Sequence, residues 1–403
     1  MTTASIDHDG DAKKPTILIA AFSGRALAQS ATRAGYAPLV ADGFGDEDTL
    51  ECTQATKRLP SALHAGFRIK SLKKALNTLK ANATTPPVGL ILGTGFEEHP
   101  TLIDALSRDF TILGNTARTV ARSKDPSYFL DVLKDLGIAH PKTSLTMPQN
   151  PRGWIKKRVG GSGGLHITGN FSNIRPTPDA RQGTSNNFYQ RVEMGTPISL
   201  AGVVSKRGAA FGVCRQWQNP IPRWPYRFGG IVSPIDIPHE TEAYMINSGL
   251  DLTRRLGLKG FVSFDFMITQ TDILLLEINP RPTAALDILD GPQGHMFKAH
   301  ISACHDQDPS IIVLPRNSKT APELINHTHA IAYLYADHGA LQIPDIAWPS
   351  WAGDRPKPGT HVNAHRPLAT VSATAKSDLE AENLCRKRLG ELENLLYAPG
   401  RKD

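Results

Sequence analysis

The sequence predicts a mixed α/β and α+β protein that begins with a doubly wound α/β domain. Three apolar, strand-like segments in the first third of the chain, 16–22, 37–42 and 88–93, alternate with helical stretches. Strands that alternate with helices are typical of a parallel sheet. Farther along, strand patterns come in neighbouring pairs, which favours α+β units. A length of 403 residues also leaves room for two or three domains.

The first strand-like segment, 16–22, is followed by a helical stretch of small residues that Gly35 is expected to close. No GxGxxG motif follows this strand, so the sequence does not support a dinucleotide-binding fold. The third strand leads into a turn and a helix that begins at Thr101. We therefore place one doubly wound domain at residues 14–115, after a tail at 1–13 whose polar sequence predicts disorder.

Composition and charge narrow the classes of function. The net charge is +7 at pH 7, but the basic residues are dispersed, so anionic small molecules explain the excess as well and nucleic-acid binding is not expected. No apolar run is long enough to span a membrane, and the first residues lack the apolar segment of a secretory signal. The four cysteines, Cys52, Cys214, Cys304 and Cys385, form no CxxC pair, which favours reduced thiols in a cytoplasmic protein.

Three further elements follow the first domain. A helix is predicted after residue 123, because Asp125 is a suitable N-cap and Pro126 occupies the first helical position. Residues 188–192 and 198–204 have strand-like sequences and are expected to pair across the turn between them. Residues 239–257 have the apolar spacing of an amphipathic helix.

The strongest signal for chemistry is the segment 264–282, FDFMITQTDILLLEINPRP. Its strands at 261–268 and 272–279 are predicted to form a hairpin, with Asp265 and Glu277 on neighbouring strands. A charged hairpin whose acids face solvent is the alternative interpretation. However, Glu277 follows three consecutive leucines, and a carboxylate at the end of an apolar run is costly without a partner.

Side-chain alternation along the second strand points Glu277 and Asn279 to the same face. Together with Asp265 they offer three oxygen ligands, which suit Mg²⁺ because this ion prefers carboxylates, water and phosphate oxygens. Arg281 follows shortly after, and its guanidinium can bind a phosphate or an oxyanion through two parallel hydrogen bonds. The hairpin is therefore predicted to be a magnesium and phosphate site.

A glycine-rich turn, GGSGG at 160–164, lies between two strand-like segments. Glycines allow successive backbone N–H groups to face one anion, and a neighbouring lysine adds a point charge. The turn is not a Walker A motif, because it lacks GK[ST]. Taken alone, it is equally typical of a flexible hairpin turn.

These elements occur in the order found in ATP-grasp enzymes, and the whole chain resembles that superfamily. The resemblance implies an N-terminal pre-ATP-grasp α/β domain followed by a clamp of two α+β subdomains around ATP. Residues 116–187 would form the first subdomain, which carries the glycine-rich loop. Residues 188–304 would form the second, which carries the metal site, and residues 305–403 a small C-terminal extension.

The resemblance also assigns roles to residues. One or two Mg²⁺ ions, for which Mn²⁺ can substitute, would be held by Asp265, Glu277 and Asn279. Lys124 matches the first phosphate-binding lysine of the family, and either Lys156 or Lys157 matches the second. Lys157 has the better spacing to the loop, and alternation allows only one of the two to face the nucleotide. The loop residues expected to bind phosphate are Gly161, Ser162, Gly163 and Gly164.

The segment FYQRVEMGTP resembles the hinge that receives adenine through its backbone. The candidates for that contact are Gln190, Arg191 and Val192. Many relatives carry an acidic residue just after the hinge glycine, where it binds ribose. This chain has Thr196 there, so either Glu193 substitutes for the acidic residue or ribose is held in another way.

The activity that the resemblance implies is ATP-dependent ligation of a small-molecule carboxylate to an amine, through an acyl-phosphate. The catalytic residues would be Arg281, Asn279 and Lys157. Glu97, in a loop after a sheet strand, is a further candidate for substrate contact, whereas His295 and His300 are interpreted as surface or supporting groups. A homodimer is expected by analogy.

Three segments, GLILGTGFEEHPTLIDAL, GNTARTVARSKDP and WPSWAGDRPKPGTHVNAHRPLATVSA, resemble a branch described as carboligases related to biotin carboxylase. That branch is similar to tyramine/tyrosine–glutamate ligases of methanofuran-type cofactor synthesis. The resemblance implies amino acid–glutamate ligation in one-carbon cofactor (methanofuran or methylofuran) biosynthesis. Two alternatives are biotin-carboxylase-like carboxylation and a non-catalytic nucleotide-binding protein.

Overall fold

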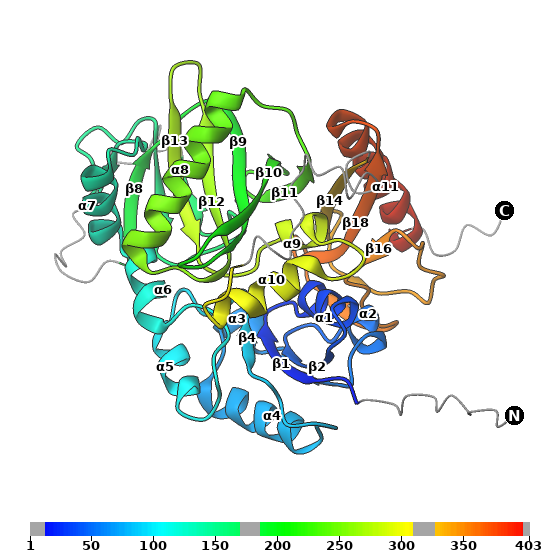
Figure 1. The fold of residues 1–403 in the computed structure, drawn as a ribbon. Helices are drawn as coiled ribbons and strands as arrows, with labels where there is room; N and C mark the ends of the chain where they lie inside the picture. Colours follow the sequence, from blue (N-terminus) through cyan, green and yellow to red (C-terminus); the bar gives the residue numbers. More distant parts are fainter. Residues whose placement is uncertain (1–12, 170–185, 309–326, 398–403) are drawn as a thin grey trace, which may run out of the picture.

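The computed structural model describes residues 13–169, 186–308 and 327–397 (Figure 1). Nearly all of the predicted tail at 1–13 therefore lies outside the described residues. Among the described helices, none combines the length and hydropathy that a membrane span needs. All four cysteines are described and have free thiols, as predicted.

The N-terminal domain is built on a parallel sheet with strand order β3-β2-β1-β4. Its strands are β1 (Thr16–Ala21), β2 (Ala37–Asp42), β3 (Ala55–Arg58) and β4 (Leu90–Leu92). The three predicted strands are confirmed. The sequence did not predict β3, because its residues, ATKR, are only half-buried or exposed and lack the apolar pattern of a strand.

Helices cover both faces of this sheet, as parallel sheets require. Its helices are α1 (Arg25–Arg33), α2 (Glu47–Glu51), α3 (Ala62–Ala65), α4 (Ile69–Ala81) and α5 (Thr101–Ser107). Alternation along β1 sends Leu18 into a core with α4 and α5, and sends Ile17 and Ile19 into a core with α1. The second core continues into the rest of the molecule, because it also contains Phe261 and Phe297.

A small antiparallel sheet, with strand order β5-β8-β6-β7, forms the next unit. Its strands are β5 (Thr143–Ser144), β6 (Trp154–Arg158), β7 (Ile167–Thr168) and β8 (Asn187–Arg191), preceded by α6 (Ala117–Lys124) and α7 (Pro126–Leu136). The predicted cap of α7 is confirmed, since the Asp125 side chain accepts a hydrogen bond from the Tyr128 N–H at 3.0 Å. The glycine-rich loop lies between β6 and β7.

The main sheet has eight strands in the order β13-β12-β9-β10-β11-β14-β18-β16. Its strands are β9 (Thr196–Val204), β10 (Ala209–Gln218), β11 (Phe228–Ser233), β12 (Gly260–Ile268), β13 (Ile273–Asn279), β14 (Thr328–Tyr335), β16 (Ala352–Gly353) and β18 (Pro367–Ala375). The remaining elements are α8 (His239–Leu256), α9 (Ala285–Leu289), α10 (His295–Cys304), α11 (Asp378–Tyr397) and the two-stranded pair of β15 (Leu341–Gln342) and β17 (His361–Val362). The predicted helix at 239–257 is confirmed as α8.

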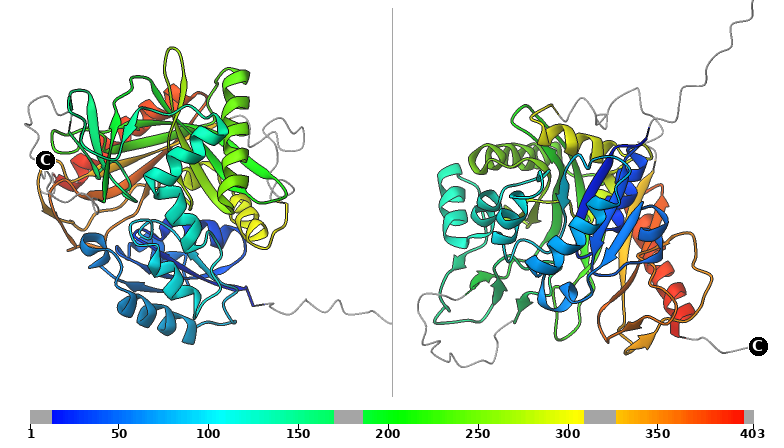
Figure 2. Two further views of the ribbon diagram at one scale, coloured as in Figure 1. Left: turned by 90° about the vertical axis from the view of Figure 1, so that its left-hand side faces the viewer. Right: turned by 90° about the horizontal axis from the view of Figure 1, so that it is seen from below.

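The main sheet also crosses the predicted boundary between residues 304 and 305, because β14 pairs with β11 and β18 pairs with β14. Figures 1 and 2 show the N-terminal domain on one side of this sheet, with α9 and α10 in contact with both α1 and the sheet. The C-terminal strands are thus built into the same sheet that carries the β12–β13 hairpin.

The predicted pairing of the strands at 188–192 and 198–204 is wrong. β8 belongs to the small sheet, where it pairs with β5 and β6. β9 is the third strand of the main sheet, and both of its edges are taken by β10 and β12. Every residue from Ile198 to Val204 is buried, so this strand gains more from a central position than from a hairpin with the half-buried β8.

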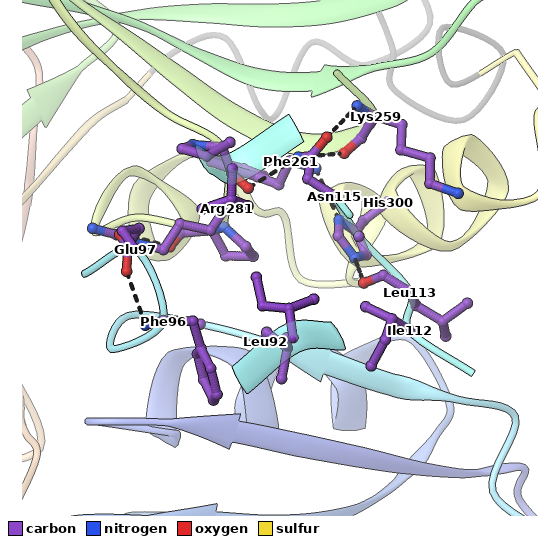
Figure 3. Close-up of a pocket in the computed structure, with 16 residues that line it drawn as sticks. Leu92, Phe96, Glu97, Ile112, Leu113, Asn115, Lys259, Phe261, Arg281 and His300 are labelled. Atoms are coloured by element: carbon purple, nitrogen blue, oxygen red, sulfur yellow. Dashed lines mark hydrogen bonds and ion pairs between the residues drawn. The ribbon is translucent and has the colours of Figure 1, made fainter. Parts of the chain in front are cut away.

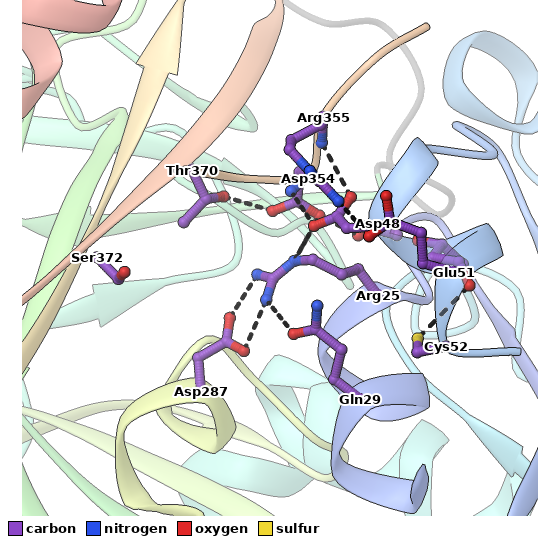
Figure 4. Close-up of polar contacts among 12 residues, drawn as sticks. Arg25, Gln29, Asp48, Glu51, Cys52, Asp287, Asp354, Arg355, Thr370 and Ser372 are labelled. Carbon is purple, nitrogen blue, oxygen red and sulfur yellow. Dashed lines mark hydrogen bonds and ion pairs between the residues drawn. The ribbon is translucent and has the colours of Figure 1, made fainter. Parts of the chain in front are cut away.

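A buried cluster around Arg25 joins the N-terminal domain to the C-terminal part of the chain (Figure 4). The Arg25 guanidinium donates two hydrogen bonds to Asp287, at 3.0 and 2.6 Å, and its Nε lies 3.0 Å from Asp354 Oδ1. The backbone N–H groups of Asp354 and Arg355 donate to the Asp48 carboxylate at 2.8 and 3.0 Å. One buried arginine therefore fixes α1, α9 and the segment before β18 relative to each other.

Candidate active site

The predicted metal ligands converge at the end of the β12–β13 hairpin. The hairpin is confirmed, with Asp265 opposite Glu277 in its register. The Asn279 Nδ2 group donates to Asp265 Oδ2 at 2.9 Å and to Glu277 Oε1 at 3.4 Å. All three side chains therefore share one face, as alternation along the strands predicts.

Lys124, the last residue of α6, reaches this group of oxygens. Its Nζ donates to Asn279 Oδ1 at 3.0 Å and lies 3.7 Å from Glu277 Oε2. The two residues are separated from Lys124 by more than 150 positions, so only the fold brings them together. The oxygen atoms of Glu277 and Asn279 on β13 therefore face a positively charged group.

Asp265 is oriented by three residues that the sequence did not single out. Its Oδ1 atom accepts hydrogen bonds from Ser199 at 2.6 Å, Ser263 at 2.8 Å and Gln216 at 3.3 Å. Ser199 and Gln216 come from β9 and β10, and no motif in the sequence connects these strands with the hairpin. Only Ser263 could have been found, since alternation places it two residues before Asp265 on the same face.

The two carboxylates of the hairpin have opposite electrostatic environments. Burial and the nearby charge of Glu277 raise the pKa of Asp265. Burial also acts to raise the pKa of Glu277, but the charges of Lys124 and Lys157 outweigh it and lower that pKa. Glu277 is therefore the more firmly ionised of the pair, and its charge is balanced by the neighbouring lysines.

The structure separates Lys156 from Lys157. Lys157 is buried, its Nζ donates to Gln190 Oε1 at 3.3 Å, and the ammonium lies over the Phe188 ring at 5.6 Å from the centroid. Burial lowers the pKa of Lys157. Lys156 is half-buried and is absent from the lining of the pocket described next. Alternation along β6 thus points Lys157, the better spaced of the two, toward Glu277.

A pocket lies between α6, α7, the small sheet and β13. Its lining includes Lys124, Lys157 and Glu277 together with Gly160, Gly161, His166, Gln190 and several apolar side chains of α7. Asp265 and Asn279 do not line it, but Asn279 donates hydrogen bonds to both Asp265 and Glu277. Cationic, anionic and apolar groups therefore meet in one hollow, as expected of a site that binds both the phosphates and the base of a nucleotide.

The glycine-rich loop is docked against two other parts of the molecule. The Phe228 N–H donates to the Gly163 carbonyl oxygen at 3.1 Å, and a Cβ on Gly164 would come within 1.8 Å of the Tyr226 carbonyl oxygen. At the base of the loop, Arg158 forms an ion pair with Glu98 at 2.7 Å. Of the four predicted phosphate-binding residues, only Gly161 lines the pocket, whereas Ser162, Gly163 and Gly164 do not.

The predicted adenine hinge is only partly at the pocket. Gln190 is buried and lines it, but Arg191, Val192 and Glu193 do not. The Arg191 N–H donates to the Lys142 carbonyl oxygen at 2.8 Å, and the Val192 N–H donates to the Gly153 carbonyl oxygen at 2.9 Å. Because these two backbone donors already have partners, Val192 and Arg191 are less suitable for base recognition than the sequence suggested.

Arg281 forms a buried ion pair with Glu97 from the N-terminal domain (Figure 3). Its Nε donates to Glu97, and its Nη1 donates to the Pro282 carbonyl oxygen at 3.0 Å. The other oxygen of Glu97 accepts from the Gly95 and Phe96 N–H groups at 3.1 and 3.2 Å. Burial acts to raise the pKa of Glu97, but the charges of Arg281 and Lys124 outweigh it and lower that pKa.

Of the two alternatives for His300, the surface position is wrong, because the residue is buried. Its side chain lines a small pocket together with Glu97 and Arg281 (Figure 3). Its Nδ1 accepts from the Phe261 N–H at 2.8 Å, so Nε2 carries the proton and donates to the Leu113 carbonyl oxygen at 3.1 Å. Burial lowers the pKa of His300 to about 4. It joins α10 to the N-terminal domain as a neutral side chain.

Within the described ranges, no three His, Cys, Asp or Glu side chains are grouped closely enough to hold a metal ion. The hairpin supplies two carboxylates and an amide instead. Such a set fits Mg²⁺, which usually keeps several waters and is bound by one or two carboxylates plus phosphates of the substrate.

Comparison with known proteins supports the assignment of the fold. Residues 124–285 match the model of an ATP-grasp domain. The biotin carboxylase of Campylobacter jejuni, solved as a β,γ-ATP complex, is 14% identical, with a TM-score of 0.65 over 92% of this chain and 90% of that one. N5-carboxyaminoimidazole synthetase from Staphylococcus aureus is 16% identical, with a TM-score of 0.62 over 93% and 97%.

The biotin carboxylase domain of 2-oxoglutarate carboxylase from Hydrogenobacter thermophilus, solved as a dimer with MgADP, ADP and bicarbonate, is also similar. It is 11% identical, with a TM-score of 0.63 over 92% of this chain and 88% of that one. No curated protein matches the sequence. At these identities the solved structures establish the fold.

Proposed function

This chain contains an ATP-grasp domain within an ATP-grasp fold related to that of biotin carboxylase, and from this premise we propose that it is an ATP-dependent ligase joining a carboxylate to an amine. The observation that carries the proposal is the meeting of Lys124, Lys157 and Glu277 in one pocket, with Asn279 hydrogen-bonded to both Glu277 and Asp265. Such a constellation suits the positioning and charge stabilisation that phosphoryl transfer requires.

The residues that would hold Mg²⁺ are Asp265, Glu277 and Asn279. The ion would neutralise charge on the nucleotide phosphates. The Lys124 ammonium lies 3.0 Å from Asn279 Oδ1 and 3.7 Å from Glu277 Oε2, and this supports the assignment because two of the three proposed ligands already face a cationic group. Lys124 and Lys157 line the same pocket and would bind the phosphates beside the ion.

The chemistry that we propose has two steps. A carboxylate oxygen attacks the γ-phosphorus of ATP, and the bond from that phosphorus to the bridging oxygen of ADP breaks. The amine nitrogen then attacks the acyl carbon, inorganic phosphate leaves and the nitrogen loses a proton. Lys124, Lys157 and the loop amides would stabilise charge on the transferring group, and Arg281 would stabilise the tetrahedral oxyanion. Closure of the loop would exclude water from the acyl-phosphate.

Glu97 gives Arg281 a defined orientation for this role. The ion pair uses Nε of the guanidinium, and Nη1 is taken by Pro282, so Nη2 is the donor best placed for substrate. Lys124 contributes to the low pKa of Glu97 and also contacts Asn279, which brings the arginine and metal regions together. We propose that the acid substrate binds between them.

For the substrates themselves, we propose an amino acid or amine such as tyrosine or tyramine together with glutamate, in synthesis of a methanofuran-type cofactor. This part of the proposal rests on the sequence resemblance described above. A homodimer acting on small molecules in the cytoplasm is part of the same proposal; the Hydrogenobacter thermophilus domain was solved as a dimer.

Carboxylation is the second candidate function, because the fold is similar to biotin carboxylase over nine-tenths of both chains. It would use the same ATP-binding residues, with bicarbonate as the carboxylate and a nitrogen atom of the second substrate as the acceptor. The two candidates differ in the substrates that ADP formation requires.

The test is ADP release from Mg-ATP by the full chain, screened against glutamate paired with tyrosine, tyramine and other amines, and against bicarbonate. We expect release that depends on both an acid and an amine, with an amide mass in the product. Release driven by bicarbonate alone would favour carboxylation. Absence of release with every combination, although ATP binds, would favour a non-catalytic nucleotide-binding protein.

A further inference from the structure

The glycine-rich loop rests on the backbone of residues 226–228, at the start of β11. The Phe228 N–H donates to the Gly163 carbonyl oxygen at 3.1 Å. A Cβ on Gly164 would lie only 1.8 Å from the Tyr226 carbonyl oxygen, so the two backbones are in direct contact there. Gly164 also has a φ of +74°, a conformation that favours glycine. We refer to residues 226–228 as the loop seat.

Arg227, the central residue of the loop seat, is fully buried and is held on several sides. Its Nε donates to the Asn219 carbonyl oxygen at 2.8 Å, and Nη1 and Nη2 donate to the two carboxylate oxygens of Asp337 at 2.9 and 2.6 Å. The guanidinium carbon lies 3.9 Å from the centroid of the Tyr335 ring. Two parallel hydrogen bonds to a carboxylate, together with stacking on an aromatic ring, fix the orientation of an arginine.

The groups that hold the loop seat come from the C-terminal part of the chain. Tyr335 ends β14, and Asp337 follows it, 110 positions after Arg227. The Tyr335 hydroxyl donates to the Phe228 carbonyl oxygen at 2.8 Å, so the residue that binds the loop through its N–H is itself held through its carbonyl group. The hydrogen bonds from Arg227 lower the pKa of Asp337, and His365 Nδ1 lies 3.0 Å from the same carboxylate.

The other side of the loop belongs to the nucleotide pocket. Gly160 and Gly161 line that pocket, whereas no residue of the loop seat does. Glycine-rich backbone binds an anion only when its N–H groups converge on one point. Because ordering a loop at the moment of binding costs free energy, a loop that is already held in place binds its ligand more tightly.

We propose that Arg227 and Asp337 are positioning residues, which hold the glycine-rich loop at the nucleotide pocket through the loop seat. The inference rests on the proposed ATP-dependent function for its ligand, a nucleoside triphosphate. It gives the C-terminal part of the chain a role in nucleotide binding, although neither residue lines the pocket. Loss of the ion pair frees the seat, the loop gains conformational freedom, and the nucleotide binds more weakly.

The first measurement is hydrogen exchange of the full chain without nucleotide, read by mass spectrometry over residues 159–168 and 226–233. Asp337→Asn preserves the size of the side chain but removes the charge that holds Arg227. We expect exchange in both segments to become faster by about tenfold, because the loop and its seat open together more often.

Two further variants accompany this measurement. Tyr335→Phe removes only the hydroxyl that supports Phe228, so it tests the same seat with a smaller change and is expected to speed exchange by about threefold. Glu382→Gln is the matched control, because this buried acid of α11 holds another arginine of the main sheet, Arg215 of β10. Its two segments should exchange as in the wild type.

The second measurement is the affinity for Mg-AMPPNP, a slowly hydrolysed ATP analogue, by calorimetry. Gly164→Ala displaces the loop directly, because its Cβ has no room beside the Tyr226 carbonyl oxygen. We expect Asp337→Asn and Gly164→Ala each to weaken binding by about fivefold. The double variant should bind no more weakly than the weaker single variant, because the contact between loop and seat can be lost only once.

Unchanged exchange over residues 159–168 in folded Asp337→Asn and Tyr335→Phe would overturn the inference. A double variant whose loss of affinity is the product of the two single losses, about 25-fold, would overturn it as well, since Asp337 would then act apart from the loop. Failure of the wild type to bind Mg-AMPPNP would contradict the proposed function and the role in nucleotide binding with it. The exchange measurement, which needs no nucleotide, would still decide whether the ion pair holds the loop.

Discussion

Replacement of Glu277 by glutamine is expected to lower ATP-dependent ADP release by at least about 100-fold. Glu277 lies 3.7 Å from the Lys124 ammonium, and the charges of Lys124 and Lys157 keep its pKa low. The substitution removes a negative charge that balances both lysines. It also removes the carboxylate that we propose as a Mg²⁺ ligand. The Mg²⁺ concentration needed for half-maximal release should rise in parallel, because one carboxylate ligand is lost.

The measurement is a coupled ADP assay over a range of Mg²⁺ concentrations, with melting temperature as a check of folding. Glu240→Gln is the matched control, since Glu240 is exposed in the first turn of α8 and lies outside the site. Full ATP-dependent product formation by a folded Glu277→Gln protein would disprove the assignment of the metal site.

Replacement of Glu97 by glutamine is expected to destabilise the protein by about 3–5 kcal/mol and to reduce ligation as well. The carboxylate is 5% exposed and pairs with the Arg281 guanidinium, which would be left as an uncompensated buried charge. The pKa of Glu97 is lowered in the folded state. Its contribution to stability is therefore present above the ordinary pKa of a glutamate and is lost as the pH falls through the lowered value.

Urea unfolding of the wild type, Glu97→Gln and Glu98→Gln at neutral pH measures the effect. Glu98 is the neighbouring residue, and its ion pair with Arg158 is partly exposed, with 51% of the arginine side chain and 33% of the glutamate side chain accessible. Such a pair contributes at most about 1 kcal/mol. If both variants lose the same stability, Glu97 does not form the buried pair on which the Arg281 geometry depends.

The parts of the fold that local sequence encodes were predictable. The cap at Asp125 and the β12–β13 hairpin depend on residues within a few positions of each other, and both are as expected. β3 was missed because it has no apolar alternation. The pairing of β8 and β9 was wrong because strand partners in the main sheet are set by burial of β9 on both sides, which the short turn at Gly195 does not reveal.

The candidate site was likewise predictable only where local sequence encodes it. Alternation within β13 predicts that Glu277 and Asn279 share a face, but it cannot show that Lys124 contacts both or that Ser199 and Gln216 orient Asp265. The ion pair of Glu97 and Arg281 joins residues 184 positions apart, and no local pattern marks it. Long-range contacts of this kind decide the environment of each charged group, and only the assembled fold supplies them.

The most direct test of the central claim is to follow the oxygen atoms of the acid substrate. The acid from the pair that supports ADP release is labelled with ¹⁸O in its carboxylate, and the inorganic phosphate is analysed by mass spectrometry after one turnover. An acyl-phosphate route transfers one carboxylate oxygen to each phosphate, so we predict singly labelled phosphate in step with amide formation. Unlabelled phosphate, or label in AMP, would contradict the proposed mechanism.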